Sequence, residues 1–543
     1  MKLRTLCILL ALVMAVSLVV VSCGGSDDGG KSGNTTSNGG NSGNTSNPAV
    51  TSDAENTSNG GDPVEVSEEG PKEFVPGLDS AGVDFSGKTL KVLCQYNKNT
   101  NYEISQIIGY YRPNGDEELE DDPVKTAIQD RNNQIFDKYG ISIEAEAVSG
   151  YDDFVKRVKN DFLEDTHDYQ AFVGGANFLA PLTVEGYARD FYSLGENSYL
   201  RLDEDWWDPI TQSQMSVGGC LFMINGDILI TDDEHTKCMF FNKDIANDYE
   251  GTNAAFETPL YDLVRSGDWT MDVMYEMMKV VSVDGDNGKM DYDGEDTWGL
   301  VGVSFDTYMI IMGGGVPQVK KDADDLPVFA MADELNKNVF LKVFDIVSDR
   351  DRTLFVEDYF SWNDPQGSVV RGHFYKGKAL FMTGSICDIN GDSLRNAEIH
   401  YGILPMPKYS TIQDNYASTV NPYHFGILCI PSFVSDSDIP FVTYTLEAMA
   451  YLSKQDVTRE YYDRTLKLKR FADDDDSADV LDIVFRNRQV DISVIFNWDD
   501  CIQYYNRLRS GKNNGIESFC QAERDGFEAA MEETIQNFQN MNG

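Results

Sequence analysis

The sequence predicts an α/β protein whose folded part forms two lobes. Between residues 90 and 173, short apolar runs of strand length alternate with stretches of helical periodicity. Such alternation predicts a mostly parallel sheet with helices on both faces. The chain from about residue 72 to residue 543 is also too long for one ordinary hydrophobic core, and the 27 Tyr, 29 Phe and 6 Trp of the sequence supply ample apolar area for two.

The first predicted elements follow in βαβαβ order. They are a strand at 90–93, a helix at 124–139, a strand at 141–148, a helix at 152–163 and a strand at 169–173. Pro123 is typical of a first helical turn, and Phe154, Val158 and Phe162 share one face of the second helix. Ligands of such sheets gather at the carboxyl ends of the strands, so the segment 174–178 is either a ligand loop or a plain strand-to-helix turn.

The first residues have the pattern of a secretory signal. Lys2 and Arg4 precede a mostly apolar run at 6–21, which is too short for a comfortable membrane span. The end of the run resembles a bacterial lipobox, in which a small residue precedes a cysteine that receives the lipid and becomes the new N-terminus. The alternative is an ordinary signal peptide that ends near a cysteine, but no Ala-x-Ala site follows. We therefore expect a lipoprotein signal peptide at 1–22 and a palmitate-type lipid on Cys23.

A low-complexity linker follows the predicted lipidation site. From Gly24 to about Lys72 the composition is dominated by Gly, Ser, Asn and Thr, with too few large apolar residues to offset the entropy of ordering. We expect 23–75 to be the lipidated cysteine and a disordered tether with a reach of roughly 35 to 40 Å. No later apolar run approaches the ~18 residues that a membrane span needs. We expect the lipid anchor to hold the protein on the extracytoplasmic face of a bacterial cell membrane.

The charge of the chain excludes two classes of partner. The sequence has 90 acidic and 44 basic residues, a formal net charge of −46, and loss of Lys2 and Arg4 with the signal peptide makes it −48. Such a chain repels nucleic acid and anionic lipid surfaces. We expect no nucleic-acid partner, and a neutral ligand fits this composition better than a polyanion.

The cysteines do not have the pattern of a disulfide framework or a zinc site. Of the 9 cysteines, Cys7 would leave with the signal and Cys23 would carry the lipid. The remaining cysteines are odd in number and scattered singly, without Cys-x-x-Cys spacing. We expect buried free thiols.

Several motifs in the second half of the chain occur in a recognisable order. They are 240–244 (FFNKD), 267–272 (GDWTMD), 299–302 (GLVG), 374–381 (FYKGKALF) and 401–408 (YGILPMPK). The segments 446–448, 481–483 and 496–498 continue the series. With these motifs the chain resembles, over roughly residues 85–525, the extracellular solute-binding proteins of family 1, which are substrate-binding lipoproteins of ABC importers and include maltose-binding protein.

The resemblance implies a fold and a function. The expected fold is the two-lobed, type II periplasmic-binding-protein-like architecture, with a ligand cleft between lobes that a hinge joins. Its expected parts are lobe 1 at 76–222, lobe 2 at 223–411 and a C-terminal segment at 412–543 that returns to lobe 1 and packs helices across the hinge. The expected function is that of a tethered receptor, a monomer and not an enzyme, which captures a carbohydrate, an oligosaccharide above all. It would deliver this ligand to the transmembrane subunits of an ABC permease.

Candidate ligand residues follow from the same resemblance. A sugar needs aromatic faces for its ring hydrogens and carboxylate, amide or cationic groups for its hydroxyls. Asn177 and Phe178 lie where a ligand loop of lobe 1 belongs, Tyr96 ends the first strand, and an inter-lobe acidic contact belongs ahead of the 242–243 motif. Each candidate also has an ordinary interpretation as a packing or surface residue. The candidates are Tyr96, Asn177, Phe178, Asp232, Asp233, His235, Ser385, Asp388, Tyr423 and Trp498.

One motif has a structural interpretation in its own right. Thr270 is typical of a helix N-cap ahead of a helix at 271–280, and Asp272 would lie in the first turn, where the helix dipole favours it. Trp269 would pack just before the cap.

An acidic loop near residue 290 suggests a calcium hypothesis. Asp284, Asp286 and Glu295 match positions 1, 3 and 12 of an EF-hand loop, but Gly288 and Lys289 stand where a ligand and the turn glycine belong. An irregular site would take its oxygen ligands from Asp284, Asp286, Asp291, Asp293, Glu295 and Asp296. The alternative is a solvated Asp/Gly turn. Apart from this calcium we expect no cofactor.

Two other functions stay open from the sequence. A surface glycoside hydrolase would need two carboxylates as acid and base, and the sequence shows no local pair with that arrangement. No Gly-x-Ser-x-Gly, His-Glu-x-x-His or phosphate-loop motif occurs. A surface peptide receptor would use the same anchor and tether, but the motifs at 374–381 and 401–408 resemble family 1.

Overall fold

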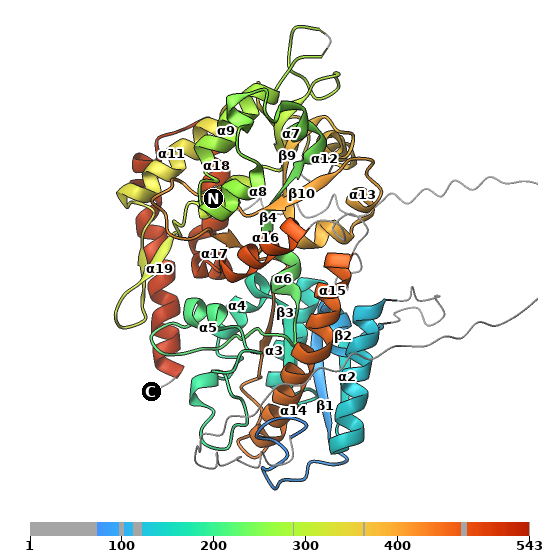
Figure 1. Cartoon of the computed structure of the whole chain (residues 1–543). Coiled ribbons are helices and arrows are strands. Elements are labelled where there is room, and N and C mark those ends of the chain that lie inside the picture. Colours follow the sequence, from blue (N-terminus) through green and yellow to red (C-terminus); the bar gives the residue numbers. More distant parts are fainter. Residues whose placement is uncertain are drawn as a thin grey trace, which may run out of the picture. The chain divides into compact units, whose positions relative to one another are not determined.

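The computed structural model describes residues 73–96, 102–111, 122–164, 166–285, 287–361, 364–467 and 475–541, which lie in one compact unit, Gly70–Gly543 (Figure 1). The predicted signal peptide, Cys23 and the linker up to residue 72 lie outside these residues. Within the described part of the chain, no helix combines the length and the apolar character that crossing a membrane requires.

A four-stranded sheet forms the centre of the first lobe. Its strands are β1 (Thr89–Tyr96), β2 (Ser142–Ser149), β3 (Ala171–Gly175) and β12 (Gly426–Cys429), in the order β12-β3-β1-β2. β1 runs parallel to β2 and β3, and β12 lies antiparallel to β3 at the edge. The predicted helices between the first three strands are α2 (Pro123–Tyr139) and α3 (Tyr151–Glu164), and a further short helix, α1 (Tyr102–Ile108), precedes α2. The predicted βαβαβ order is therefore confirmed, with element ends shifted by a few residues.

A five-stranded sheet forms the centre of the second lobe. Its strands are β4 (Lys237–Asn242), β5 (Trp298–Gly302), β8 (Thr353–Phe355), β9 (Ala379–Ser385) and β10 (Tyr401–Leu404), in the order β10-β4-β9-β5-β8. β5 is parallel to β8 and β9, whereas β4 is antiparallel to β9 and β10. Every residue of these five strands is buried, which explains why they read as continuous apolar runs.

Helices surround both sheets (Figure 1). The first lobe and the chain that leads out of it contain α1 (Tyr102–Ile108), α4 (Ala176–Val184), α5 (Pro209–Met215) and α6 (Thr231–His235). The middle of the chain contains α7 (Lys243–Tyr249), α8 (Leu260–Ser266), α9 (Met271–Val281), α10 (Asp306–Gly313), α11 (Glu334–Ser348), α12 (Ser368–Tyr375), α13 (Asp392–Arg395) and the hairpin β6 (Val319–Lys321) and β7 (Pro327–Phe329). The last part contains α14 (Ile439–Leu452), a π-helical turn (Ser453–Thr458), α15 (Arg459–Lys467), α16 (Asp475–Arg486), α17 (Ile492–Phe496), a 3₁₀ turn (Trp498–Gln503), α18 (Tyr504–Ser510) and α19 (Ile516–Met541).

The predicted helix start at Thr270 is confirmed. The Thr270 hydroxyl accepts a hydrogen bond from the Val273 N–H at 3.4 Å, as an N-cap does. Trp269 is fully buried just before the cap, and its indole N–H donates to the Pro405 carbonyl at 2.9 Å. This bond links the start of α9 to the chain just after β10.

Three segments of the chain pass between the two sheets and pair with one another. Thr236, between α6 and β4, forms an antiparallel bridge with Val420. The short strands β11 (Ser418–Thr419) and β13 (Arg488–Gln489) pair in parallel. The segments that enter the second lobe at α6, return from it at β11 and pass the hinge again at β13 therefore lie side by side, and we call them the crossing segments.

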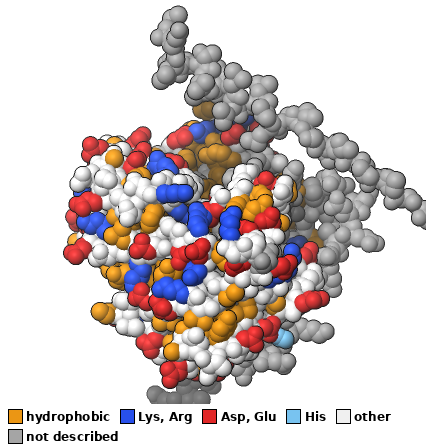
Figure 2. Space-filling model, turned by 90° about the horizontal axis from the view of Figure 1, so that it is seen from above, with side chains coloured by type: hydrophobic (Ala, Val, Ile, Leu, Met, Phe, Trp, Pro, Cys, Tyr) orange, Lys and Arg blue, Asp and Glu red, His pale blue; other side chains and the backbone are white. Residues whose placement is uncertain are grey.

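On the face of the molecule in Figure 2, acidic and basic side chains are interspersed with apolar ones. Lys and Arg lie there among Asp and Glu, in place of the broad basic surface typical of nucleic-acid binders.

A buried carboxylate organises the first lobe beneath α14. Glu447 has no exposed side-chain area. Its Oε1 accepts from Arg201 Nε and from Trp206 Nε1, both at 3.0 Å, and its Oε2 accepts from Trp207 Nε1 at 2.8 Å. The carboxylate therefore accepts from two buried indole N–H groups and from the partly exposed Arg201, all in a segment about 240 residues away in sequence.

We predict that Glu447→Ala lowers the free energy of unfolding by about 3 kcal/mol, because two buried indole N–H groups and the partly exposed Arg201 guanidinium lose their acceptor. Urea unfolding followed by tryptophan fluorescence measures the change. The control is Glu533→Gln, at an exposed position of α19, which should stay within about 0.5 kcal/mol of the parent. A loss for Glu447→Ala as small as that of the control would contradict the anchoring role.

Candidate functional site

The carboxyl end of β3 approaches a crossing segment closely. A Cβ on Gly175 would lie 2.6 Å from the Tyr423 carbonyl oxygen, so glycine is required for this approach. The next residue, Ala176, donates its N–H to the Phe425 carbonyl at 2.7 Å. The Gly174-Gly175 segment thus holds the start of α4 against the turn that contains Tyr423.

Aromatic side chains from both lobes meet at this junction. The Phe178 ring lies 5.0 Å from the Tyr151 ring and 6.0 Å from the Tyr423 ring, measured between centroids. The Tyr423 ring lies 6.2 Å from the ring of Phe305, which precedes α10 in the second lobe. All four side chains are partly exposed. They form an aromatic surface of the kind against which the apolar hydrogens of a ligand ring can pack.

Polar side chains lie at the neighbouring ends of β4 and β9. The His235 and His424 rings stack with centroids 4.9 Å apart, and Cys387 Sγ lies 3.7 Å from His235 Nδ1. Asp388 Oδ2 accepts from Arg371 Nη2 at 2.8 Å and from the Ser385 N–H at 3.0 Å.

These groups form one inter-lobe cluster. A further ion pair joins Lys237, which lies opposite Ser385 across the β4–β9 ladder, to Asp306 at 3.7 Å. The cluster comprises Tyr151, Phe178, His235, Lys237, Phe305, Asp306, Arg371, Ser385, Cys387, Asp388, Tyr423 and His424.

The charges of the inter-lobe cluster balance. Burial raises the pKa of Asp388, but Arg371 and the Ser385 N–H outweigh it and hold that pKa below its usual range, so the carboxylate is ionised. Burial lowers the pKa of His235, helped by His424 and Lys237, and burial together with Lys237 lowers the pKa of His424. Both imidazoles are therefore neutral at neutral pH. Two ion pairs and two neutral rings suit a neutral, hydroxyl-rich ligand better than a charged one.

A strained turn borders the cluster. Asn497, Asp499 and Asp500 have φ values of 49°, 54° and 59°, in the left-handed region that non-glycine residues rarely adopt. The turn lies near Tyr423. Burial raises the pKa of Tyr423; a hydrogen bond with Gln503 opposes this increase, and the charge of Asp500 adds to it. Strained backbone concentrates at ligand sites. The sequence could have indicated this turn, because Asn and Asp recur at 497–500 and are the non-glycine residues that best tolerate φ > 0.

The structure brings together half of the ligand residues predicted from the sequence. Phe178, His235, Ser385, Asp388 and Tyr423 belong to the inter-lobe cluster. The sequence analysis missed the residues that pair with them or extend the aromatic surface, namely Tyr151, Lys237, Phe305, Asp306, Arg371, Cys387 and His424.

The other five predicted ligand residues lie elsewhere. The Tyr96 ring packs edge-on against Tyr111 at 5.3 Å. Asn177 Nδ2 donates to the Val494 and Ile495 carbonyls of α17 at 2.9 and 3.2 Å. Trp498 is 3% exposed, and its indole N–H donates to Thr534 at 2.9 Å within the core. The remaining two predicted residues, Asp232 and Asp233, form ion pairs with Arg488.

The acidic loop is held by hydrogen bonds in its described part. Asp296 is fully buried and accepts from the N–H groups of Gly285 at 2.9 Å and Asp291 at 2.6 Å. Glu295 pairs instead with Lys378, and Asp286 lies outside the described residues. Among the residues that the structure describes, no group of three or more His, Cys, Asp or Glu side chains is placed to hold a metal ion. The structure therefore gives the calcium hypothesis no support.

Comparison with known proteins identifies the fold. No family model matches the chain, and no curated protein matches it. One similar solved structure is a cyclo/maltodextrin-binding protein complexed with maltotetraose, with a TM-score of 0.50 and 13% identity over 84% of this chain and 98% of that one. Another is a cyclic alpha-maltosyl-1,6-maltose binding protein from Arthrobacter globiformis, with a TM-score of 0.50 and 11% identity over 83% of this chain and 99% of that one.

The chain has the two-lobed periplasmic-binding-protein-like fold. The predicted fold class is thereby confirmed. The inter-lobe cluster draws its rings from both lobes and from the segment between them.

Proposed function

We propose that this protein is a solute-binding receptor of an ABC importer and that it captures a carbohydrate, above all an oligosaccharide, between its lobes. The main support is the inter-lobe cluster, in which partly exposed rings from both lobes lie beside ionised side chains. Sugars present apolar ring hydrogens and hydroxyls together, so this combination matches their chemistry. The similar structures with TM-scores of 0.50 are described as binding proteins for maltodextrins and a cyclic maltosyl sugar, which agrees with the proposal.

Capture would work by closure of the lobes. Phe178 belongs to the first lobe, Phe305 to the second, and Tyr423 to a crossing segment between them, so a ligand that contacts all three is bound best when the lobes are close. A ligand shifts an open–closed equilibrium only by its difference in affinity for the two states. No bond of the ligand needs to be made or broken for this role.

The cluster favours a receptor over the two alternatives. A glycosidase needs one carboxylic acid that is protonated at the working pH, whereas the pKa of Asp388 is held down by Arg371 and by the Ser385 N–H despite its burial. A peptide receptor needs charges left over for the ligand termini. In the described cluster, Arg371 pairs with Asp388 and Lys237 with Asp306.

A thermal-shift screen of the purified protein tests the proposal. The plate contains mono- and oligosaccharides, including maltotetraose, and dipeptides as the competing class. A ligand at 100 times its Kd adds about 2.7 kcal/mol to stability. We expect a shift with one class of sugar, and recovery of that sugar unchanged. A shift with dipeptides alone, or recovery of a cleaved sugar, would contradict the receptor proposal.

We predict that Tyr423→Ala weakens binding of the sugar found in the screen at least tenfold, equivalent to about 1.4 kcal/mol, because the ring that joins the two lobes is lost. Isothermal titration calorimetry measures the affinity. Tyr192→Ala removes a tyrosine that is 49% exposed and outside the cluster, and it should leave the affinity unchanged. Equal affinities of the two variants would exclude the cluster as the sugar site.

We also propose that the receptor is tethered by a lipid on Cys23 and exposes its lobes on the extracytoplasmic face of the membrane. Support comes from the lipobox-like pattern and from the low-complexity linker behind it. In a bacterial host, Cys23→Ser should move the protein from the membrane fraction to the soluble fraction and abolish incorporation of labelled palmitate. Cys7→Ser, within the predicted signal, is the control and should change neither. Palmitate incorporation that persists in Cys23→Ser would refute the anchor.

A further inference from the structure

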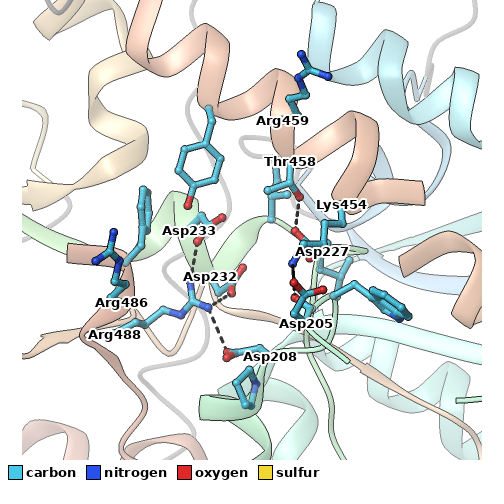
Figure 3. Close-up of a pocket in the computed structure, with 17 residues that line it drawn as sticks. Asp205, Asp208, Asp227, Asp232, Asp233, Lys454, Thr458, Arg459, Arg486 and Arg488 are labelled. Atoms are coloured by element: carbon cyan, nitrogen blue, oxygen red, sulfur yellow. Dashed lines mark hydrogen bonds and ion pairs between the residues drawn. The ribbon is translucent and has the colours of Figure 1, made fainter. Parts of the chain in front are cut away.

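A pocket lies beside the crossing segments, apart from the inter-lobe cluster. It encloses about 510 Å³, and none of its lining residues belongs to that cluster. Its walls come from the segment before α5, from α6, from the π-helical turn before α15 and from the junction of α16 with β13 (Figure 3). We call it the hinge pocket. Its volume falls within the range of about 300 to 1,000 Å³ typical of small-molecule sites.

One cation of the hinge pocket faces three carboxylates. Arg488 Nη2 lies 2.7 Å from Asp232 Oδ2 and 3.3 Å from Asp208 Oδ2, and Arg488 Nη1 lies 2.7 Å from Asp233 Oδ1 (Figure 3). The Arg488 side chain is only 10% exposed, and those of Asp208 and Asp232 are 5% and 8% exposed. Three carboxyl groups, of which Asp233 is 13% exposed, therefore share one guanidinium in a region of low dielectric constant. Burial raises the pKa of Asp232 and of Asp233, and Arg488 acts against this increase, so the acidic groups are in excess over the charge that pairs with them.

A fourth carboxyl group increases this excess. Asp227 accepts a hydrogen bond from Thr458 Oγ1 at 2.6 Å. The pKa of Asp227 is raised to about 7, mainly by burial. The charges of Asp233 and Asp205 also raise this pKa, whereas the hydrogen bond from Thr458 and the charge of Lys454 lower it. A carboxyl group that is half protonated near neutral pH lacks a full counter-charge.

Two other cations of the hinge pocket have acidic partners of their own. Lys454 Nζ pairs with Asp205 Oδ2 at 2.8 Å and donates to the Asp205 carbonyl at 2.7 Å. Arg486 pairs with Asp482 at 3.0 Å. In Figure 3 the Arg459 side chain points away from the carboxylates around Arg488. A positive charge on a ligand would therefore meet carboxyl groups with which none of these three side chains forms a described ion pair, although Lys454 partly offsets the charge of Asp227.

The hinge pocket also offers a hydrogen-bond donor and aromatic walls. Arg488 Nε is buried and has no hydrogen-bond partner among the described residues. Buried donors without a partner are rare in proteins, and an acceptor such as a hydroxyl oxygen would satisfy this one. Tyr462 and Phe485, which pack edge-to-face at 5.2 Å, line the same pocket together with Trp206. Their rings can cover an apolar carbon chain or attract an ammonium group.

We propose that the hinge pocket is a second ligand site and that it binds a small hydroxylated amine, the class to which amino alcohols and amino sugars belong. The ammonium group is bound by the carboxyl groups of Asp227, Asp232 and Asp233. A hydroxyl accepts from Arg488 Nε, and the carbon chain packs on the aromatic wall. The assignment does not depend on the proposed sugar site, since the two share no residue.

Calorimetry with a matched pair of probes tests the assignment on the purified protein. N-methylglucamine carries an ammonium group and five hydroxyls, and sorbitol is similar in size and hydroxyl content but neutral. We expect N-methylglucamine to bind at least tenfold more tightly than sorbitol. No binding of the amine at 10 mM, or equal affinity for both probes, would overturn the proposal.

The pH dependence of binding gives an independent test. The amine binds the ionised form of Asp227, so at low pH binding must first displace a proton. Affinity should therefore rise about tenfold between pH 6 and pH 8, as expected for a carboxyl group with a pKa of about 7. In Asp227→Asn the affinity should be lower and the tenfold rise should shrink, leaving only the contribution of Asp232 and Asp233, whose pKa values burial also raises. In Asp436→Asn, at a carboxylate that is 94% exposed, affinity and pH profile should match the parent. An unchanged pH profile in Asp227→Asn would overturn the proposal.

Two further variants distinguish loss of amine binding at the hinge pocket from misfolding and from binding at the proposed sugar site. Thr458→Val keeps the side-chain volume but removes the hydroxyl that stabilises ionised Asp227, so the rise in affinity should move to higher pH. This variant gives a result even where Asp227→Asn fails to fold. Tyr423→Ala should leave binding of the amine unchanged while it weakens sugar binding. Loss of amine binding in Tyr423→Ala would place the amine in the inter-lobe cluster and refute the hinge pocket as its site.

Discussion

The pairing of the three crossing segments is the constraint on which the rest of the structure depends. Thr236 pairs with Val420, and β11 pairs with β13, so three distant parts of the sequence lie side by side between the two sheets. At the same place Arg488 draws together Asp208, Asp232 and Asp233. Because a buried charge is costly unless it is paired, these contacts favour one arrangement of the segments over others. The carboxyl end of β3 and the ends of β4 and β9 are thereby fixed next to each other.

Two sites of opposite electrostatic character flank this junction. In the inter-lobe cluster, Arg371 and Lys237 are matched by Asp388 and Asp306, and the two histidines stay neutral. In the hinge pocket, three carboxyl groups share the guanidinium of Arg488. A formal net charge of −46 for the whole chain does not reveal this difference. Only the local pairing decides that one site suits a neutral ligand and the other a cation.

The sequence predicted the architecture well because its signals are local. Alternation of apolar runs with helical periodicity located the βαβαβ unit, and Thr270 marked the start of α9 through a bond to a residue three positions away. Phe178, Ser385 and Asp388 could be proposed because the family resemblance places ligand residues at the carboxyl ends of strands, and these residues lie at or just after the ends of β3 and β9.

The rest of the site depends on contacts between distant residues. Arg488 lies 255 residues from Asp233 in sequence, so nothing near either residue indicates their ion pair. For Trp498 the difficulty is that the local sequence fits two interpretations, since an aromatic residue in a polar turn can belong to a ligand site or to the core. Its hydrogen bond to Thr534 in α19 shows that it belongs to the core. Phe305 and Arg371 could not be assigned to the cluster from the sequence, because the fold of the second lobe positions them there.

The central claim is that a sugar binds between the lobes and draws them together. Fluorescence energy transfer between dyes on Leu163→Cys in the first lobe and Leu335→Cys in the second tests it directly, since these positions are 74% and 50% exposed and the described native cysteines are buried or only partly exposed. The account predicts that saturating sugar shortens the distance between the dyes and that Tyr423→Ala shifts this response to higher sugar concentrations. A sugar that binds, by calorimetry, without changing the distance would contradict it.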